Sequence, residues 1–90
     1  MPYWSVTIEV TLKKGVLDPQ GQAIEHALHA LGHETVDRVR QGKVIQLRVQ
    51  AATEGEARQS VEKMCHELLS NPVMESHEIH IVPDLQQGAA

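Results

Sequence analysis

The chain has 90 residues, a single cysteine and a formal net charge of −4. This length suits one domain, one cysteine excludes an internal disulfide, and the acidic balance argues against general nucleic-acid binding. No apolar run approaches the roughly 18 residues of a membrane span and no signal peptide is evident, so we expect a cytoplasmic protein. Tyr3 and Trp4 are the only aromatic residues, and so small an aliphatic core favours a homodimer.

Residues 4–12 alternate between apolar and polar side chains, which predicts a strand with one buried face. Asp18 is a good N-cap for the helix that comes next, and Pro19 suits its first position because the fixed φ of proline is helical. Gly32 fits the left-handed position that ends a helix. At helical spacing within this segment lie the apolar residues Ile24, Ala27, Leu28 and Leu31.

Residues 35–41 and 43–51 are predicted to form a hairpin around Gln41 and Gly42. Apolar residues alternate regularly in the second strand. In the first strand, Val36 and Val39 fall on opposite faces unless a bulge intervenes. Such an irregular strand suits a sheet edge or an interface.

A capping box, Thr53-Glu54-Gly55-Glu56, predicts the start of a second helix, which Asn71 and Pro72 should end. Residues 77–82 are predicted to form a last short strand. The apolar stripe of this helix consists of Ala57, Val61, Met64, Cys65 and Leu68.

The predicted order is βαββαβ, the ferredoxin-like α+β fold with a four-stranded antiparallel sheet and two helices on one face. Residues 1–82 form a single domain in this interpretation, and residues 83–90 form a flexible C-terminal tail. The second sheet face must be solvated or covered by a partner. Because many unrelated activities share this fold, it does not identify a function.

The stretch KKGVLDPQG, residues 13–21, raises the possibility of a phosphate-binding loop. A nucleotide-binding loop of the GxxxxGK type places its lysine after the second glycine, followed by Ser or Thr. Here the lysines precede the first glycine, and the Asp18 carboxylate would compete with phosphate for the N–H groups at the helix start. We therefore interpret the stretch as the entrance to a helix.

Catalytic, metal and cofactor sites are not expected in this chain. The six histidines include no HExxH pattern and no supporting cysteine pair, so we interpret them as solvent-facing. Cys65 lies on the apolar stripe and is interpreted as a small buried hydrophobe. Base-stacking aromatic residues of an RNA-binding domain are also missing from the central strands. The remaining interpretation is an interaction module.

Three stretches carry a resemblance to a known family: VTLKKGVLDPQGQAIEHALHALG (10–32), VDRVRQGKVIQL (36–47) and MCHELLSNPVMESHEI (64–79). Together they resemble PurS, the small subunit of phosphoribosylformylglycinamidine synthase in purine biosynthesis. The resemblance runs in order to about Val82. It implies a non-catalytic dimer that bridges a glutaminase subunit (PurQ) and a synthetase subunit (PurL) and supports ammonia transfer between them. ATP and magnesium would be bound by the synthetase subunit.

The resemblance also implies that the helix entrance is a partner contact, and local charge adds the residues around the hairpin as a second hypothesis. Scattered, solvated charges are the alternative interpretation of these basic side chains. The predicted contact residues are Lys14, Gly15, Asp18, Pro19, Gln20, Arg38, Arg40 and Lys43.

Two other functions stay open from the residues alone. An ACT-like dimeric regulatory domain shares the βαββαβ order and binds a small metabolite at the subunit interface, where Gly15 and Asp18 would suit a site. A stand-alone hydrolase of the acylphosphatase kind is the third reading, although its loop would need an arginine where this chain has lysines.

Overall fold

The computed structural model describes residues 1–85 and consists of one antiparallel sheet, two α-helices and a π-helical turn. None of the described helices has the length and apolar character needed to cross a membrane. In chain order the elements are β1 (Tyr3–Leu12), α1 (Pro19–Ala30), β2 (Lys43–Gln50), α2 (Glu54–Met64), η1 (Cys65–Leu69) and β3 (Glu75–Pro83).

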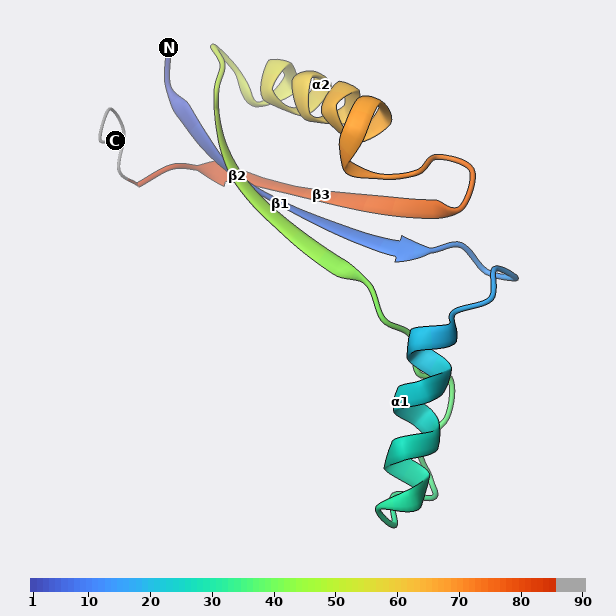
Figure 1. The fold of residues 1–90 in the computed structure, drawn as a ribbon. Coiled ribbons are helices and arrows are strands. Elements are labelled where there is room, and N and C mark those ends of the chain that lie inside the picture. Colours follow the sequence, from blue (N-terminus) through green and yellow to red (C-terminus); the bar gives the residue numbers. More distant parts are fainter. Residues whose placement is uncertain (86–90) are drawn as a thin grey trace.

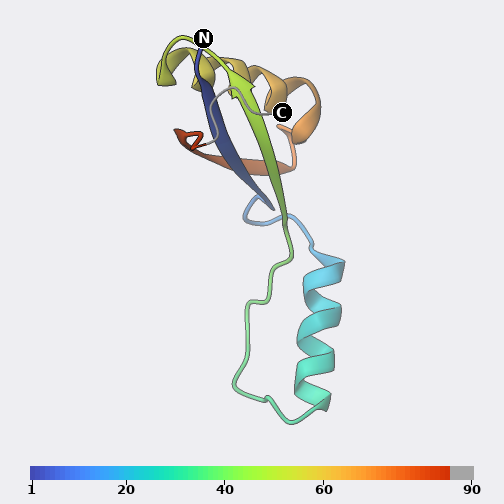
Figure 2. The same ribbon diagram turned by 90° about the vertical axis from the view of Figure 1, so that its left-hand side faces the viewer.

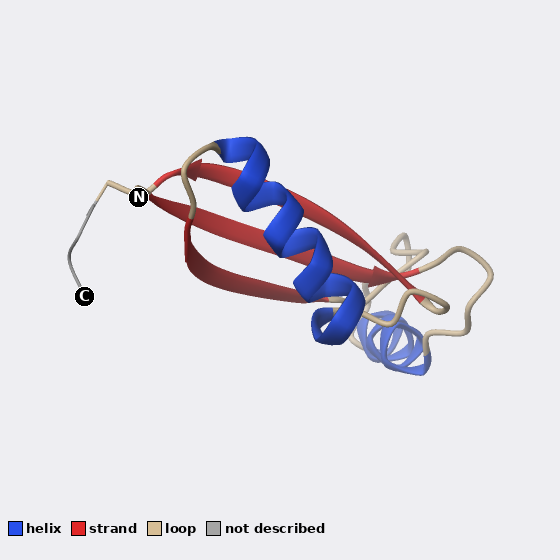
Figure 3. Ribbon diagram, turned by 90° about the horizontal axis from the view of Figure 1, so that it is seen from above, coloured by secondary structure: helices blue, strands red, loops and turns tan. Residues whose placement is uncertain are grey.

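The sheet has the order β2-β1-β3, with β1 antiparallel to both neighbours. Its register places Val6 between Leu47 on one side and Ile81 on the other, so the core-facing residues of all three strands share one face. Helix α2 lies across that face (Figures 1 and 3). The core between them consists of Val6, Ile8, Val10, Val61, Cys65 and Ile79.

The predicted strand at residues 35–41 is wrong. Within the described residues the sheet has three strands. Residues 33–42 run back beside α1 and do not join the sheet (Figure 2). The Val36 carbonyl lies 2.6 Å from His29 Nε2, and Val39 N–H donates to Glu25 Oε1 at 3.3 Å. Single bonds to a helix replace a strand ladder because this chain offers residues 35–41 no neighbouring strand.

Helix α1 begins as predicted, with the Asp18 side chain as N-cap and Pro19 at its first position. Gly32 comes after it with φ of +103°, the left-handed conformation that glycine adopts without strain. The helix does not pack on the sheet, so the prediction of two helices on one face is wrong. It projects beyond the end of the sheet together with the returning segment, and we call residues 19–42 the helical arm (Figure 1).

Helix α2 begins at the predicted cap, where Thr53 Oγ1 accepts a hydrogen bond from Glu56 N–H at 3.2 Å. Its last turn widens into η1, which adds a residue to the turn and rotates the next side chains around the helix axis. Leu69 packs against the core in consequence, whereas Leu68 is 82% exposed. The prediction that Leu68 belongs to the buried stripe is therefore wrong.

Strand β3 continues to Pro83, one residue beyond the predicted end of the domain. The next residue, Asp84, is also bound to the sheet: its N–H donates to the Tyr3 carbonyl, and its carboxylate lies 2.8 Å from Arg48 Nε. Residues 83 and 84, which the prediction assigned to the tail, are thus bound to the sheet. Residues 86–90 of that tail lie outside the described residues.

We expect the helical arm to be sensitive to Gly21→Ala. A Cβ atom at Gly21 would lie 2.4 Å from the Val39 carbonyl oxygen and 2.7 Å from Asp18 Oδ2, so the returning backbone would have to move. Urea unfolding should show a loss of about 1–3 kcal/mol. Gly55→Ala is the control, because its Cβ would meet nothing closer than 3.9 Å, and it should stabilise by about 0.5–1 kcal/mol. Equal effects of the two substitutions would contradict this packing.

Candidate functional site

Asp18 lies where the helical arm leaves the sheet, and its side chain is 8% exposed. Its Oδ1 accepts from Gly21 N–H at 2.9 Å, the N-cap bond of α1. Its Oδ2 accepts from Gln41 N–H at 2.9 Å, just before β2 begins. One carboxylate therefore joins the start of the helical arm to its end.

These hydrogen bonds lower the pKa of Asp18 below its usual range. The largest cause is the backbone N–H of Gln41, followed by that of Gly21, because both donate to the ionised form. Burial of the carboxylate opposes them and the guanidinium of Arg40 adds to them. Asp18 is thus held as an anion, and its acceptor positions face backbone donors.

Arg40 supports the same junction through backbone contacts. Its Nη2 donates to the carbonyls of Leu12 at 2.8 Å and Lys13 at 3.3 Å, at the end of β1. Its Nε lies 3.9 Å from Asp18 Oδ2, at the outer limit of an ion pair, and the side chain is partly exposed. We attribute the role of Arg40 mainly to its hydrogen bonds, because a long surface ion pair contributes little.

The predicted contact residues lie around two open depressions that meet at Asp18. One has a volume of about 380 Å³, and the other of about 430 Å³. Lys14 lies on the nearby turn and lines neither depression. Pro19, Gln20 and Lys43 line the first depression, and Gly15, Arg38 and Arg40 line the second.

Arg38 is exposed and has a φ of +54°, the only positive φ outside glycine among residues 1–85. Side chains with a Cβ adopt this left-handed region at a cost. The conformation turns the returning segment between Val36 and Val39, both of which bond to α1. Arg38 was predicted as a contact from its charge, and its sequence context gives no sign of this backbone geometry.

The turn at residues 71–75 also belongs to this end of the molecule, although it was not among the predicted contact residues. Lys13 N–H donates to the Met74 carbonyl at 2.9 Å, and Lys13 Nζ donates to the Pro72 carbonyl at 2.8 Å. Residues 13 and 71–75, which belong to two of the three stretches that carry the family resemblance, therefore meet at one site. Their joint presence in those stretches was the signal that could have linked them.

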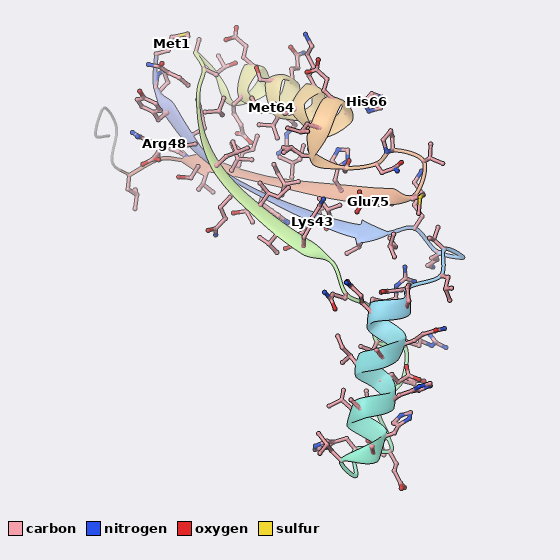
Figure 4. All side chains as sticks on the ribbon, viewed as in Figure 1. Met1, Lys43, Arg48, Met64, His66 and Glu75 are labelled. Carbon is pink, nitrogen blue, oxygen red and sulfur yellow. The ribbon has the colours of Figure 1, made fainter. Side chains whose placement is uncertain are left out.

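The other candidate groups offer little for chemistry. Cys65 is buried, and burial is the main cause that raises the pKa of its thiol, with Glu62 adding to it. His66 lies on the outer side of the helix, away from the sheet (Figure 4). Among residues 1–85, potential metal ligands gather in a group of three only at Glu9, Glu78 and His80, all exposed on the sheet face opposite α2. The absence of a metal site stays a prediction.

The geometry disfavours the ACT-like reading, which needs Gly15 and Asp18 to hold a metabolite. Both oxygens of Asp18 already accept backbone hydrogen bonds that fix the fold. A ligand would have to displace the Gln41 or Gly21 N–H and so release the helical arm.

Asp18→Asn should remove a pH-dependent part of the stability. The folded pKa of Asp18 lies below the unfolded value of about 3.9, so its contribution is fully present above that pH and is lost as the pH falls through the folded pKa. Asparagine can still cap α1 but cannot accept from both N–H groups with oxygen. The difference in unfolding free energy between wild type and variant should be largest near pH 7 and shrink below about pH 4. A difference that stays constant from pH 7 to pH 3 would contradict this role.

Comparison with known proteins gives the family. The model of the PurS family, described as phosphoribosylformylglycinamidine (FGAM) synthase, matches residues 5–83. The PurS subunit of this synthase from Methanocaldococcus jannaschii is 38% identical over 78 residues, which are 87% of this chain and 94% of that protein. The Bacillus subtilis PurS subunit is 37% identical over 78 residues, covering 87% and 92%.

Solved structures agree with this result. The crystal structure of Methanocaldococcus jannaschii PurS has a TM-score of 0.81 at 37% identity and covers 90% of this chain and 98% of its own. A chain in the structure of PurLQS from Thermotoga maritima has a TM-score of 0.84 at 38% identity, with coverage of 91% and 100%. The match extends over the sheet, α2 and the sequence of the helical arm, and this chain therefore belongs to the PurS family, the PurS subunits of phosphoribosylformylglycinamidine synthase.

Proposed function

We propose that this chain is a non-catalytic subunit of phosphoribosylformylglycinamidine synthase, a dimer that bridges the PurQ glutaminase and PurL synthetase subunits and supports ammonia transfer between them. The observation that carries the proposal is the match to a chain of Thermotoga maritima PurLQS over 91% of this sequence. The purS subunit of Thermotoga maritima belongs to the synthase classified as EC 6.3.5.3. The family resemblance implies formylglycinamide ribonucleotide, glutamine and ATP as substrates of the assembled enzyme. ATP and magnesium would be bound by PurL.

A non-catalytic role agrees with the state of the titratable groups. The Asp18 carboxylate is engaged by the backbone, and the Cys65 thiol is buried with a raised pKa. A buried neutral thiol is a poor nucleophile, and a carboxylate whose acceptor positions are engaged is a poor general base. The exposed surfaces of the chain are therefore better candidates for its function than its reactive groups.

One such surface is the apolar stripe of the helical arm. Ile24 is partly exposed, Leu28 is half-buried, and Leu31 is 76% exposed. The return segment packs on another side of α1, where Glu25 and His29 bond to it. The stripe is therefore left without cover in a single chain, although its spacing is that of a helix built to pack.

An uncovered apolar surface that complements this stripe lies on the sheet beside α2. The backbone of helix α2 lies closest to β3, on the far side of β1 from β2, and Ile45, Leu47 and Val49 of β2 are only half-buried. Next to them Leu68 stands exposed because of the π-helical turn. An apolar hollow of about 360 Å³ opens here, lined by Leu47, Met64, Glu67, Leu68 and Leu69.

A second copy of the chain fits both surfaces at once. The helical arm points away from its own sheet, so it cannot reach its own β2 flank, but the arm of a second copy can cover it. Two-fold symmetry repeats the contact. Full burial of Leu31 would contribute about 1.5–3 kcal/mol, and burial of Ile24 and Leu28 would contribute less because both are already partly buried.

Leu31→Lys and Leu68→Lys should each weaken the dimer. A lysine in place of either leucine would put a charge into an apolar contact, and dissociation should be at least tenfold easier in analytical ultracentrifugation. Val44→Lys is the matched control, since Val44 is exposed on the opposite face of β2 and should leave the dimer unchanged. A wild type that is monomeric at every concentration, or variants that dimerise equally well, would contradict the proposed dimer.

Omission of this chain should abolish glutamine-dependent synthase activity of the PurQ and PurL subunits from the same organism, measured with Mg-ATP and formylglycinamide ribonucleotide. Activity with ammonia as nitrogen donor should persist, because the synthetase site lies in PurL. Glutamine-dependent activity that is unchanged without the chain would refute the bridging role.

The contact residues can be tested in the same assay. Arg38→Glu and Lys43→Glu suit charge reversal, because neither side chain has a hydrogen bond or ion pair among residues 1–85. Arg40 is unsuitable because its reversal would break the junction with β1. Each reversal should reduce capture of the partners, and full capture and activity would remove these residues from the proposed contact set, which also holds Lys14, Pro19 and Gln20.

A further inference from the structure

Two carboxylates lie side by side on the face of the sheet that α2 does not cover (Figure 3). Glu9 of β1 and Glu78 of β3 are directly opposite one another in the register, and both are exposed. Their neighbours along the strands, Val10 and Ile79, point to the other face and belong to the core. Like charges that are directly opposite on adjacent strands destabilise a sheet, so this pair is unfavourable unless a cation balances it.

The adjacent positions on this face supply no lysine or arginine for the pair. On the β2 side Glu9 is opposite Val44, and at the next outward-facing position of β1 and β3 Thr11 is opposite Ser76. Among residues 1–85 the only charged or ionisable group paired with either carboxylate is His80, two positions along β3 on the same face. A neutral imidazole cannot balance two negative charges.

The spacing of His80 is not that of a hydrogen-bonded pair. Its Nε2 lies 3.7 Å from Glu9 Oε1 and 3.8 Å from Glu78 Oε1, whereas a hydrogen bond needs about 2.7–3.2 Å. On the other face of the same strand, His77 Nε2 does reach Glu62 Oε2 at 2.8 Å. The nitrogen of His80 is therefore open to a ligand that both carboxylates share with it.

A zinc ion would fit between these three side chains. Their ligand atoms all lie within 4.8 Å of one another. Zinc binds histidine nitrogen and carboxylate oxygen at about 2.0–2.2 Å in tetrahedral geometry, which places two ligand atoms about 3.3–3.6 Å apart. Small rotations of the side chains would reach this spacing from 3.7 and 3.8 Å, and all three side chains are at least half exposed.

Room for a fourth ligand lies beside the carboxylates. A polar hollow of about 170 Å³ opens there, and the hydroxyl groups of Thr11 and Ser76 can hydrogen-bond to a water molecule in it. Three protein ligands and one water complete the coordination of zinc in open sites. The hollow is lined by Glu9, Thr11, Ser76, His77 and Glu78.

We propose that Glu9, Glu78 and His80 form a zinc site on the open face of the sheet, with water as the fourth ligand. Imidazole nitrogen suits zinc and its neighbours among the transition metals, whereas magnesium and calcium prefer oxygen ligands alone. The sequence gave no sign of this site because its ligands come from two strands and form no short motif. The proposed function does not depend on it, and the proposed dimer contact lies on the face that carries α2.

The test is calorimetric titration of the metal-free full chain with zinc, together with thermal unfolding in zinc, in magnesium and without metal. His80→Gln and Glu78→Gln remove one ligand each. The matched controls are His66→Gln and Glu34→Gln, because both side chains are exposed and lie outside the cluster. Glu78→Gln also removes one of two repelling charges, so without metal it should unfold at the same temperature as the wild type or higher.

We expect the wild type to bind one zinc ion per chain and to unfold at a higher temperature with zinc but not with magnesium. Each ligand variant should bind zinc at least tenfold more weakly, since even groups that only orient a ligand contribute that much, and the controls should bind as the wild type does. Ligand variants that bind zinc as tightly as the wild type would overturn the site. Equal stabilisation by magnesium would overturn the role of His80, and no zinc binding would leave the cluster as cross-strand ion pairs only. None of these outcomes bears on assembly with PurQ and PurL.

Discussion

The hydrogen bonds of the Asp18 carboxylate decide the shape of this protein. Gly21 and Gln41 donate to its two oxygens, so the chain that leaves β1 and the chain that enters β2 are held at one point. All residues between them must then protrude as a paired unit, the helix going out and the return segment coming back. Gly21 permits this pairing because only a residue without a Cβ leaves room for the Val39 carbonyl.

A protruding arm leaves the protomer with an incomplete core. A ferredoxin-like chain would fold its first helix onto the sheet beside the second, and here that place over β2 is open. The surface of the arm that would have filled it is still apolar. The helices and strands thus have the sequence pattern of a domain with a complete core, although a single chain leaves part of that core uncovered. This geometry supports the proposed dimer independently of what any relative does.

Local patterns predicted the parts of the fold that depend on local physics. The strand at residues 4–12, both N-caps and the glycine after α1 are as the sequence indicated, because alternation and capping involve residues only a few positions apart. The strand at residues 35–41 failed because a strand needs a neighbour, and Val36 and Val39 bond to α1 instead. Leu68 was assigned to the buried face because the prediction assumed the 3.6-residue period of an α-helix. The π-helical turn adds a residue and shifts Leu68 off that face.

The candidate site was predicted less completely, because some of its residues stabilise the backbone and others are exposed on the surface. Asp18, Gly15 and Arg40 were chosen as contacts, yet the bonds of Asp18 and Arg40 and the φ of Gly15 serve the backbone. Whether they touch a partner stays a prediction, but each of them restricts the backbone around the turn that carries Leu17 and Lys14. A surface ordered in advance loses less entropy on binding than a flexible one, so more of its contact energy appears as affinity. Sequence motifs that are chosen as contact candidates can therefore serve to hold the backbone of their neighbours in one conformation.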